Sequence, residues 1–147
     1  MRTPLLSGLL VLLAACDPAR EVRLQVVNDS QEKQVDITVR CDGKLVLDTL
    51  VAKYKSADDR LRRRLYLRPG LHRIVAESRQ QRTRLDTTIS TAETNVLGIT
   101  FRYDSLGPRT QKTYFADGAA GEITFPAFYV RRSFRLFQFQ TRGRLQP

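Results

Sequence analysis

Histidine, cysteine and tryptophan are scarce in this chain, and their scarcity excludes several kinds of functional site. The 147 residues include one histidine, His72, two cysteines, Cys16 and Cys41, and no tryptophan. A single histidine excludes a metal site built on a histidine pair and leaves His72 as the only imidazole for a serine or cysteine triad. Two cysteines are too few for a disulfide scaffold or a cysteine-rich metal site. We therefore expect no bound metal and no cofactor.

Signatures of catalysis are also missing. The sequence has no glycine-rich phosphate loop and no strand-turn-helix pattern of a nucleotide-binding fold. His72 comes just after a Pro-Gly turn, which is the setting of a strand residue, and Asp58 and Asp59 are neighbouring carboxylates in a loop. The prediction is a noncatalytic protein. The alternative is an envelope hydrolase or other enzyme in which His72 works with a carboxylate such as Asp58 or Asp59.

The apolar run at the N-terminus is too short to span a membrane as a helix. Leu5 to Ala15 is interrupted only by Ser7 and Gly8 and has eleven residues, whereas a spanning helix needs about 20. Arg2 precedes it. A positive charge followed by a short apolar run is the pattern of an export signal peptide.

The end of this leader, Leu13-Ala14-Ala15-Cys16, resembles the lipobox of bacterial lipoproteins. The resemblance implies that Cys16 receives a diacylglycerol, becomes the mature N-terminus and usually gains an amide-linked acyl chain. Several chains anchor stably because each buried methylene contributes about 0.8 kcal/mol. Residues 1–15 are then the signal peptide, 16–20 a lipidated tether and 21–147 a single β domain. The alternative is an ordinary secretory leader followed by a chance cysteine.

Positive charge is concentrated in the second part of the chain. Residues 16–57 hold seven basic and seven acidic side chains, whereas residues 58–147 hold seventeen basic and eight acidic ones. Nine arginines lie between Arg60 and Arg84, with Glu77 as the one acid among them. Guanidinium groups suit phosphates and carboxylates, so the cluster predicts an anion-binding face, with a solvated surface as the alternative. The candidate anion-binding residues are Arg62, Arg64, Arg68, Arg73 and Arg79.

Short alternating apolar segments predict an all-β fold. No stretch after Glu21 has a sustained helical period, and apolar segments recur with a spacing typical of a sandwich or barrel. We expect an antiparallel β-sandwich of Ig-like or prealbumin-like type. The expected strands are Val22–Asn28, Val35–Arg40, Leu45–Val51, Leu61–Leu67, His72–Ser78, Thr83–Ser90, Val96–Tyr103, Ile123–Val130 and Phe134–Thr141.

Two turns make the expected strand pairing specific. A three-residue loop, Cys41-Asp42-Gly43, sets Val39 opposite Leu45 and Ile37 opposite Leu47 and makes one face wholly apolar. It leaves Cys41 at the turn, with a buried inert thiol as the alternative. The second turn, Arg68-Pro69-Gly70-Leu71, has the residues of a type II turn and predicts a hairpin that sets Leu65 against Ile74 and Leu67 against His72.

The same turns are similar to elements of PEGA-like surface β modules. Cys41-Asp42-Gly43-Lys44 resembles their Asp-Gly-Lys element, and Leu67-Arg68-Pro69-Gly70-Leu71-His72-Arg73-Ile74 resembles their Leu-x-Pro-Gly-x-His element. The eponymous Pro-Glu-Gly-Ala motif is absent. The resemblance implies a β-sandwich.

The last third of the chain divides into a loop and an aromatic segment. Residues 104–121 are rich in Gly, Pro, Ser and polar residues and predict a long loop, with a short strand at Thr113 to Phe115. Phe134, Leu136, Phe137 and Phe139 break strict alternation, so we expect a bulge or an exposed ring there.

These features together predict an exported lipoprotein of the cell envelope that is anchored in a membrane through Cys16. Its expected function is noncatalytic binding or structural support, with the basic face toward anionic lipid, lipopolysaccharide or acidic glycan. An envelope protein is a further possible partner. Export past the membrane makes nucleic acid an unfavourable partner. The sequence leaves open whether the inner or the outer membrane holds the anchor.

Overall fold

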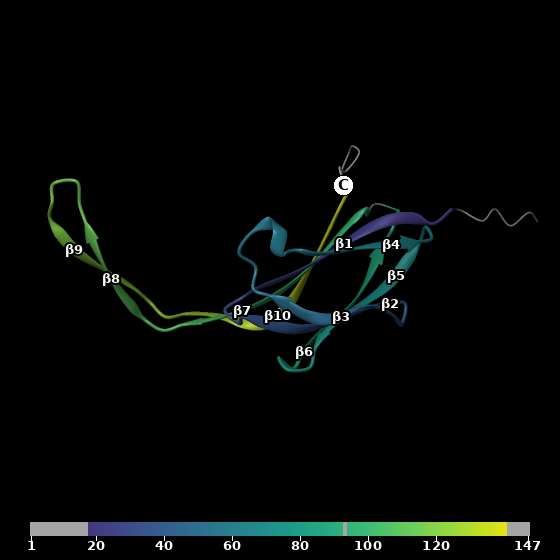
Figure 1. Ribbon diagram of the computed structural model, residues 1–147, viewed down its shortest axis with the longest axis horizontal. Helices are drawn as coiled ribbons and strands as arrows, with labels where there is room; N and C mark the ends of the chain where they lie inside the picture. The colour runs from purple at the N-terminus through teal and green to yellow at the C-terminus, as the bar shows by residue number, and fades with distance from the viewer. Residues whose placement is uncertain (1–17, 93, 141–147) are drawn as a thin grey trace, which may run out of the picture.

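The computed structural model describes residues 18–92 and 94–140, and within them the protein is all-β (Figure 1). Ten strands form three sheets, and these residues contain no α-helix, only a 3-10 turn, η1 (Ala57–Asp59). The leader, the lipobox and Thr141 lie outside the described residues. The strands are β1 (Arg20–Ser30), β2 (Gln34–Cys41), β3 (Lys44–Ala52), β4 (Leu61–Leu67), β5 (Leu71–Ser78), β6 (Thr83–Ser90), β7 (Val96–Leu106), β8 (Arg109–Tyr114), β9 (Ala120–Phe125) and β10 (Phe128–Phe139).

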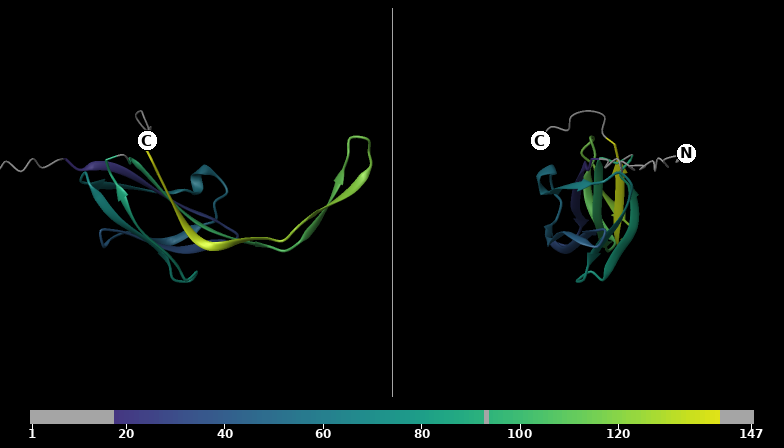
Figure 2. Two further views of the ribbon diagram at one scale, coloured as in Figure 1. Left: turned by 180° about the vertical axis from the view of Figure 1, so that it is seen from behind. Right: turned by 90° about the vertical axis from the view of Figure 1, so that its right-hand side faces the viewer.

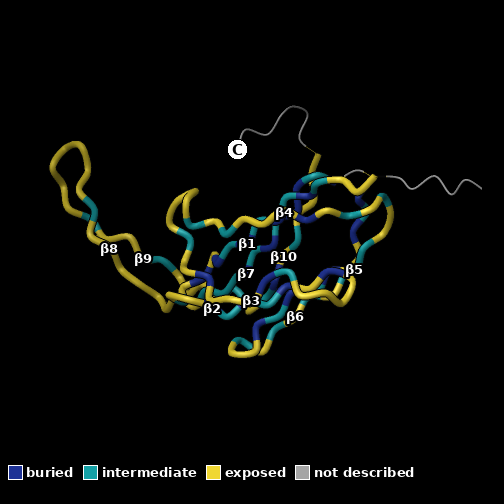
Figure 3. Tube along the Cα trace, turned by 45° about the vertical axis from the view of Figure 1, so that its right-hand side comes forward, coloured by how far each residue is buried: buried dark blue, intermediate teal, exposed yellow. Residues whose placement is uncertain are grey.

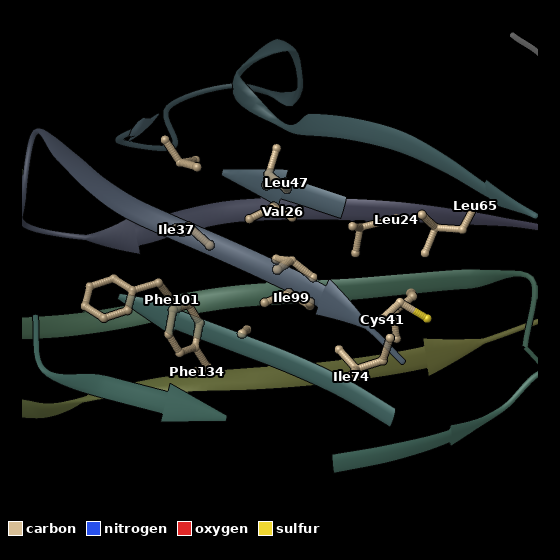
Figure 4. Close-up of a cluster of buried hydrophobic side chains, with 14 of the residues drawn as sticks. Leu24, Val26, Ile37, Cys41, Leu47, Leu65, Ile74, Ile99, Phe101 and Phe134 are labelled. Carbon is tan, nitrogen blue, oxygen red and sulfur yellow. The ribbon is translucent and has the colours of Figure 1, made fainter. Parts of the chain in front are cut away.

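Two four-stranded sheets enclose one hydrophobic core. One sheet has the order β10-β7-β1-β4 and the other β3-β2-β5-β6, while β8 and β9 form a separate two-stranded sheet. Alternate residues of each strand point between the sheets, as the period of two in a strand requires. In the interior, Leu24 and Val26 of β1 therefore lie in one cluster with Ile37 of β2 and Ile74 of β5 (Figure 4). Val22 of β1 belongs to the same cluster. Among described residues no helix is long and apolar enough to cross a bilayer.

The pairing is antiparallel except for one central pair. β1 and β7 run parallel, with Arg23 opposite Val96 and Ser30 opposite Tyr103. The sheets are thus predominantly antiparallel, as predicted from the sequence, and this parallel pair is the exception among the described strand pairs. Because β1 and β7 run in the same direction, the start of β1 and the end of β7 lie at opposite ends of the sheet.

The Asp42-Gly43 turn is tighter than predicted. Cys41 pairs with Lys44, and Asp42 (φ 49°) and Gly43 (φ 78°) both have positive φ, as in a two-residue type I′ turn. The predicted three-residue loop is wrong. A register shift next to Val39 places Val39 opposite Leu47, so an apolar face is still formed.

Cys41 ends β2 inside the core. Its exposed fraction is 5%, and Figure 4 shows its side chain at the edge of the apolar cluster. The prediction that Cys41 lies at the turn is therefore wrong, and the alternative of a buried thiol is confirmed.

The predicted hairpin between β4 and β5 does not form. β4 pairs with β1 in one sheet, and β5 pairs with β2 and β6 in the other, so the Pro69-Gly70 turn crosses between sheets. Each strand has one apolar face, and the crossing lets the buried Leu65 and Ile74 line opposite walls of one core. Gly70 has φ 144°, far from the corner of a type II turn.

Residues 104–121 form strands instead of the predicted long loop. β7 continues to Leu106, β8 and β9 pair with each other, and β10 pairs with β7. The predicted strand Ile123–Val130 is divided between β9 and β10, because Pro126 and Ala127 lie between them. The result is a hairpin arm, residues 104–130, that projects from the sandwich (Figure 2).

The aromatic segment contains both features expected for it. The pairing of β10 with β7 shifts register between Val130 and Ser133. Phe134 is buried against Phe101, with ring centroids 5.4 Å apart, whereas Phe137 and Phe139 are exposed on the outer face. The bulge precedes Phe134, so the break in alternation from Phe134 to Phe139 is resolved by the two outward rings.

Candidate functional site

A cleft of about 620 Å³ lies between β3, the edge strand of one sheet, and β4, the edge strand of the other. The β2–β3 turn and the β4–β5 turn complete its walls. The residues that line it are Cys41, Asp42, Lys44, Leu45, Val46, Arg63, Arg64, Leu65, Tyr66, Leu67, Arg68 and His72.

The cations of this cleft are largely free of acidic partners. Lys44, Arg63 and Arg68 are exposed, and none of them forms a salt bridge with another described residue. Arg64 forms a long salt bridge, in which its Nε lies 3.9 Å from a carboxylate oxygen of Glu21. One Arg63 N–H donates to the carbonyl oxygen of Arg62 at 3.2 Å. Without an acidic partner, the other donors of Lys44, Arg63 and Arg68 are available for an anion.

The cleft also exposes apolar surface. Leu45 is 54% exposed although it lies in β3, and Val46 and Leu67 are half-buried beside it. Leu65 is buried below them as part of the core. Positive groups therefore surround an apolar wall, which is the arrangement that suits a ligand with an anionic group and an apolar portion.

Asp42 and His72 form a hydrogen-bonded pair in the wall of the cleft. His72 Nδ1 lies 2.6 Å from Asp42 Oδ2, and Nε2 lies 2.7 Å from the carbonyl oxygen of Arg68. Both neighbours are acceptors, so the ring donates from both nitrogens as an imidazolium. Asp42 Oδ1 also accepts from the backbone N–H of Arg73 at 2.9 Å.

The pKa shifts agree with this pairing. The hydrogen bond from His72 and then that from the Arg73 backbone hold the pKa of Asp42 below its usual value. Partial burial acts to lower the pKa of His72, but the hydrogen bonds to Asp42 and Arg68 and the attraction of the carboxylate outweigh it. The net shift of the His72 pKa is upward.

Cys41 lies beside this pair but is not activated by it. Burial, the Asp42 charge and the hydrogen bond to Asp42 raise the pKa of the Cys41 thiol to about 11. A thiol with that pKa is protonated at neutral pH, and His72 has no free nitrogen to take its proton. The cluster is thus arranged to tie two turns together rather than to attack a substrate.

The same three residues are the one group of metal-ligand type within the described parts of the chain. Their ligand atoms lie within 4.8 Å of one another. A metal ion there would have to displace protons from Cys41 and His72, and both pKa values are shifted upward. The upward shifts of both pKa values therefore favour the protonated, hydrogen-bonded forms of Cys41 and His72 over a metal-bound form.

Asp58 and Asp59 belong to a turn outside this cleft. Asp59 Oδ2 accepts hydrogen bonds from the backbone N–H groups of Lys55 (2.9 Å) and Ser56 (2.8 Å). These bonds lower the pKa of Asp59. The carboxylate that His72 contacts is that of Asp42.

The five arginines predicted to bind anions do not gather on one face. Arg64 and Arg68 line the cleft, and Arg62 is exposed on the same strand as Arg64. Arg73 is held by Asp86 through two bonds of 2.7 and 2.6 Å, and Arg79 lies in the β5–β6 turn. The cluster in sequence is therefore divided between the cleft, the outer surface of the other sheet and a distant turn.

The candidate anion-binding residues predicted from the sequence do not include Lys44 and Arg63, and the apolar wall of the cleft was not predicted. Lys44 precedes the arginine-rich segment by many residues, and Arg63 alternates with Leu61 and Leu65 on the inward side of β4. An arginine in register with core leucines is a signal that the strand lies at an edge, where a long side chain reaches solvent. The alternation of apolar residues therefore predicts that Arg63 lies near the edge of the core, but it does not predict that Arg63 and Lys44 share one cleft.

No family model, curated protein or solved structure matches the chain. The cleft itself is therefore the feature that indicates a function.

Proposed function

We propose that this protein is a lipid-anchored, noncatalytic module of the bacterial cell envelope that binds an anionic lipid in the cleft between β3 and β4. The observation that carries the proposal is the group of unpaired cations, Lys44, Arg63 and Arg68, around exposed apolar surface at Leu45. A small anion or an acidic glycan would use the cations alone. A lipid would also use the apolar wall, as a phospholipid or the lipid portion of lipopolysaccharide does.

The position of the cleft supports a lipid ligand. Leu67, which lines the cleft, pairs with Arg20, the first residue of β1. Only three residues separate Arg20 from Cys16, and an extended chain spans at most about 3.5 Å per residue. Lipidation of Cys16 would hold the cleft within about 15 Å of the bilayer surface, so headgroups lie within its reach.

The type of β-sandwich and the absence of catalytic activity are further parts of this proposal. The Ig-like or prealbumin-like assignment and the signal peptide remain predictions from the sequence. No observation favours the alternative in which His72 acts as a base, because both of its ring nitrogens donate to acceptors.

The anchor is tested by metabolic labelling with palmitate. Wild-type chain should incorporate label, and a Cys16→Ala variant should lose it, because the thioether-linked lipid needs that sulfur. A Cys41→Ala variant is the matched control and should keep full labelling. Equal labelling of wild type and Cys16→Ala would remove the anchor from the proposal.

The ligand is tested by titration of a leaderless Cys16→Ser chain with soluble short-chain lipids. Short-chain phosphatidic acid should bind, whereas short-chain phosphatidylcholine and inorganic phosphate should bind much more weakly. The phosphatidylcholine lacks the net charge, and the phosphate lacks the apolar part. Equal binding of phosphate and phosphatidic acid would show that the apolar wall plays no role.

A further inference from the structure

The arm, residues 104–130, is a hairpin that leaves the sandwich at the end remote from the start of β1 (Figures 1 and 2). Its tip lies near Asp117, so it extends about 40 Å at the usual rise of a strand. β8 and β9 place no residue in the hydrophobic core, and nearly the whole arm is exposed in Figure 3. A two-stranded ribbon in water is marginally stable unless another surface covers it.

The arm has one apolar face and one polar face. Pairing places Phe125 beside Arg109 and Ile123 beside Gln111 on one side, and the Arg109 guanidinium lies over the Phe125 ring at 5.2 Å. The opposite side presents the Lys112–Glu122 pair. This alternation is the pattern of a ribbon that packs one face against a partner.

A prominent ring at the tip and a pocket at the root lie on the same apolar face. The Phe115 ring lies across Gly121, where an added Cβ would be 2.6 Å from the ring, and Phe115 is 55% exposed. At the root a pocket of about 300 Å³ is lined partly by Leu106, Phe125 and Phe128. The arm therefore has a projecting ring at one end and a hollow large enough for a ring at the other.

Charge separates the arm from the rest of the molecule. Residues 104–130 hold two basic and three acidic side chains, a net charge of −1, and the remaining residues hold 23 basic and 12 acidic ones, a net charge of +11. An anionic surface would attract the sandwich and not the arm. A bilayer core is also unsuitable, because the outer edges of β8 and β9 would carry unpaired backbone groups into hydrocarbon.

We propose that the arm binds the arm of a second copy of this chain, face to face and antiparallel, so that Phe115 of each copy enters the root pocket of the other. The contact is self-complementary, as a two-fold dimer requires. The antiparallel arrangement places the two basic sandwiches at opposite ends of the pair, many times farther apart than the screening length of about 8 Å. Their mutual repulsion is therefore small.

The apolar face is of a size that fits such a dimer. Leu106, Phe115, Ile123 and Phe128 are 38–55% exposed. A large side chain of this kind buries about 200 Å² in all, so these four still have about 100 Å² each, or about 400 Å² together, left to bury. Together with the intervening polar residues, the face approaches the roughly 800 Å² per partner of a standard interface.

The test is photo-crosslinking of the full chain in bacterial cells. p-Benzoylphenylalanine replaces Phe115, which keeps an aromatic ring at the tip, and in a matched variant it replaces Tyr114, whose side chain points to the polar face. The Phe115 variant should form a dimer crosslinked to residues 106–109 or 125–128 of the other copy. The Tyr114 variant should form roughly tenfold less.

A second pair of substitutions separates the two faces of β9. Ile123→Lys should reduce the crosslinked dimer from position 115 by at least tenfold, because it places an unpaired charge in the apolar contact. Thr124→Lys adds the same charge on the polar face and should leave the yield unchanged. The proposal would be overturned by crosslinks from position 115 to a different protein, to lipid or to the tip of the other arm. Equal yields of dimer from positions 114 and 115 would also overturn it.

Discussion

The Asp42–His72 pair shows how single residues in the cleft wall are held in one protonation state. The carboxylate accepts from His72 and from the Arg73 backbone, and the imidazolium also donates to Arg68. Asp42 has φ 49°, which asparagine tolerates as well as aspartate. Replacing Asp42 with asparagine therefore removes the charge and keeps the turn.

Asp42→Asn should lower the pKa of His72 toward its ordinary value. The carboxylate bond and charge raise that pKa, and burial alone lowers it. NMR titration reads the effect directly because His72 is the only histidine. An unchanged His72 pKa in the variant would contradict the pairing.

Stability should depend on pH through the same pair. His72 has a raised folded pKa, so its contribution is present below the unfolded pKa of about 6.5 and is lost as pH rises through the folded value. Asp42 has a lowered folded pKa, so its contribution is lost as pH falls from about 3.9 through the folded value. Urea unfolding should show a decline above neutral pH in wild type and a weaker one in His72→Gln.

Cys41 should resist alkylation in the folded protein. Its thiol is buried and has a pKa of about 11, and only the thiolate reacts rapidly. Iodoacetamide at neutral pH should label a leaderless Cys16→Ser chain far faster in urea than in buffer, as mass spectrometry would record. Equal rates would show that the thiol is accessible.

At the scale of strands, the alternation of apolar residues predicted most elements, and the turns predicted their pairing less well. The bounds of β4 and β6 are as expected, because Leu61–Leu67 and Thr83–Ser90 have clear turn signals on both sides. The β4–β5 connection was mispredicted, because a Pro-Gly turn has the same residues whether it joins neighbours in one sheet or crosses to another. Core burial decides between these outcomes, and it is a property of all the strands together.

Asn28 joins β1 to β3 through a bond that sequence reasoning did not predict. Its buried amide donates to the carbonyls of Glu32 (3.1 Å) and Val51 (3.2 Å) and accepts from Ser30. Asn28→Ala should lower the free energy of unfolding by about 2 kcal/mol, because buried acceptors lose their donors. The exposed neighbour change Asp29→Ala should cost less than about 1 kcal/mol. Equal losses of unfolding free energy in the Asn28→Ala and Asp29→Ala variants would contradict the stabilising role of the Asn28 amide.

The arm was mispredicted as a loop because its strands have few apolar residues between Gly, Pro and Ser. Its removal should leave the sandwich folded. Replacing residues 107–127 with a two-residue turn should change the unfolding free energy by less than about 1 kcal/mol, because no core side chain is lost. Thermal and urea unfolding would check this, and a loss of cooperative unfolding would show that the arm supports the body.

At the scale of the whole molecule, the cleft lies at the end where β1 begins, and the arm lies at the opposite end. The arginines that the sequence grouped together are separated by the fold, since alternation and the crossing at Pro69-Gly70 send neighbours to different sheets. The general location of positive charge was therefore predictable, and the membership of the cleft was not.

Binding of the unlipidated chain to vesicles is the most direct test of the central claim, that the cleft between β3 and β4 holds anionic lipid. A leaderless Cys16→Ser chain should sediment with phosphatidylglycerol vesicles and not with phosphatidylcholine vesicles. Each basic residue near an anionic surface contributes about 1 kcal/mol, so the Arg63→Gln, Arg68→Gln double variant should bind about thirtyfold more weakly. The Arg79→Gln, Arg84→Gln double variant removes the same charge outside the cleft and should bind almost as well as the parent chain. Equal loss of binding in the two double variants would contradict the account, because net charge and not the cleft would then govern the interaction.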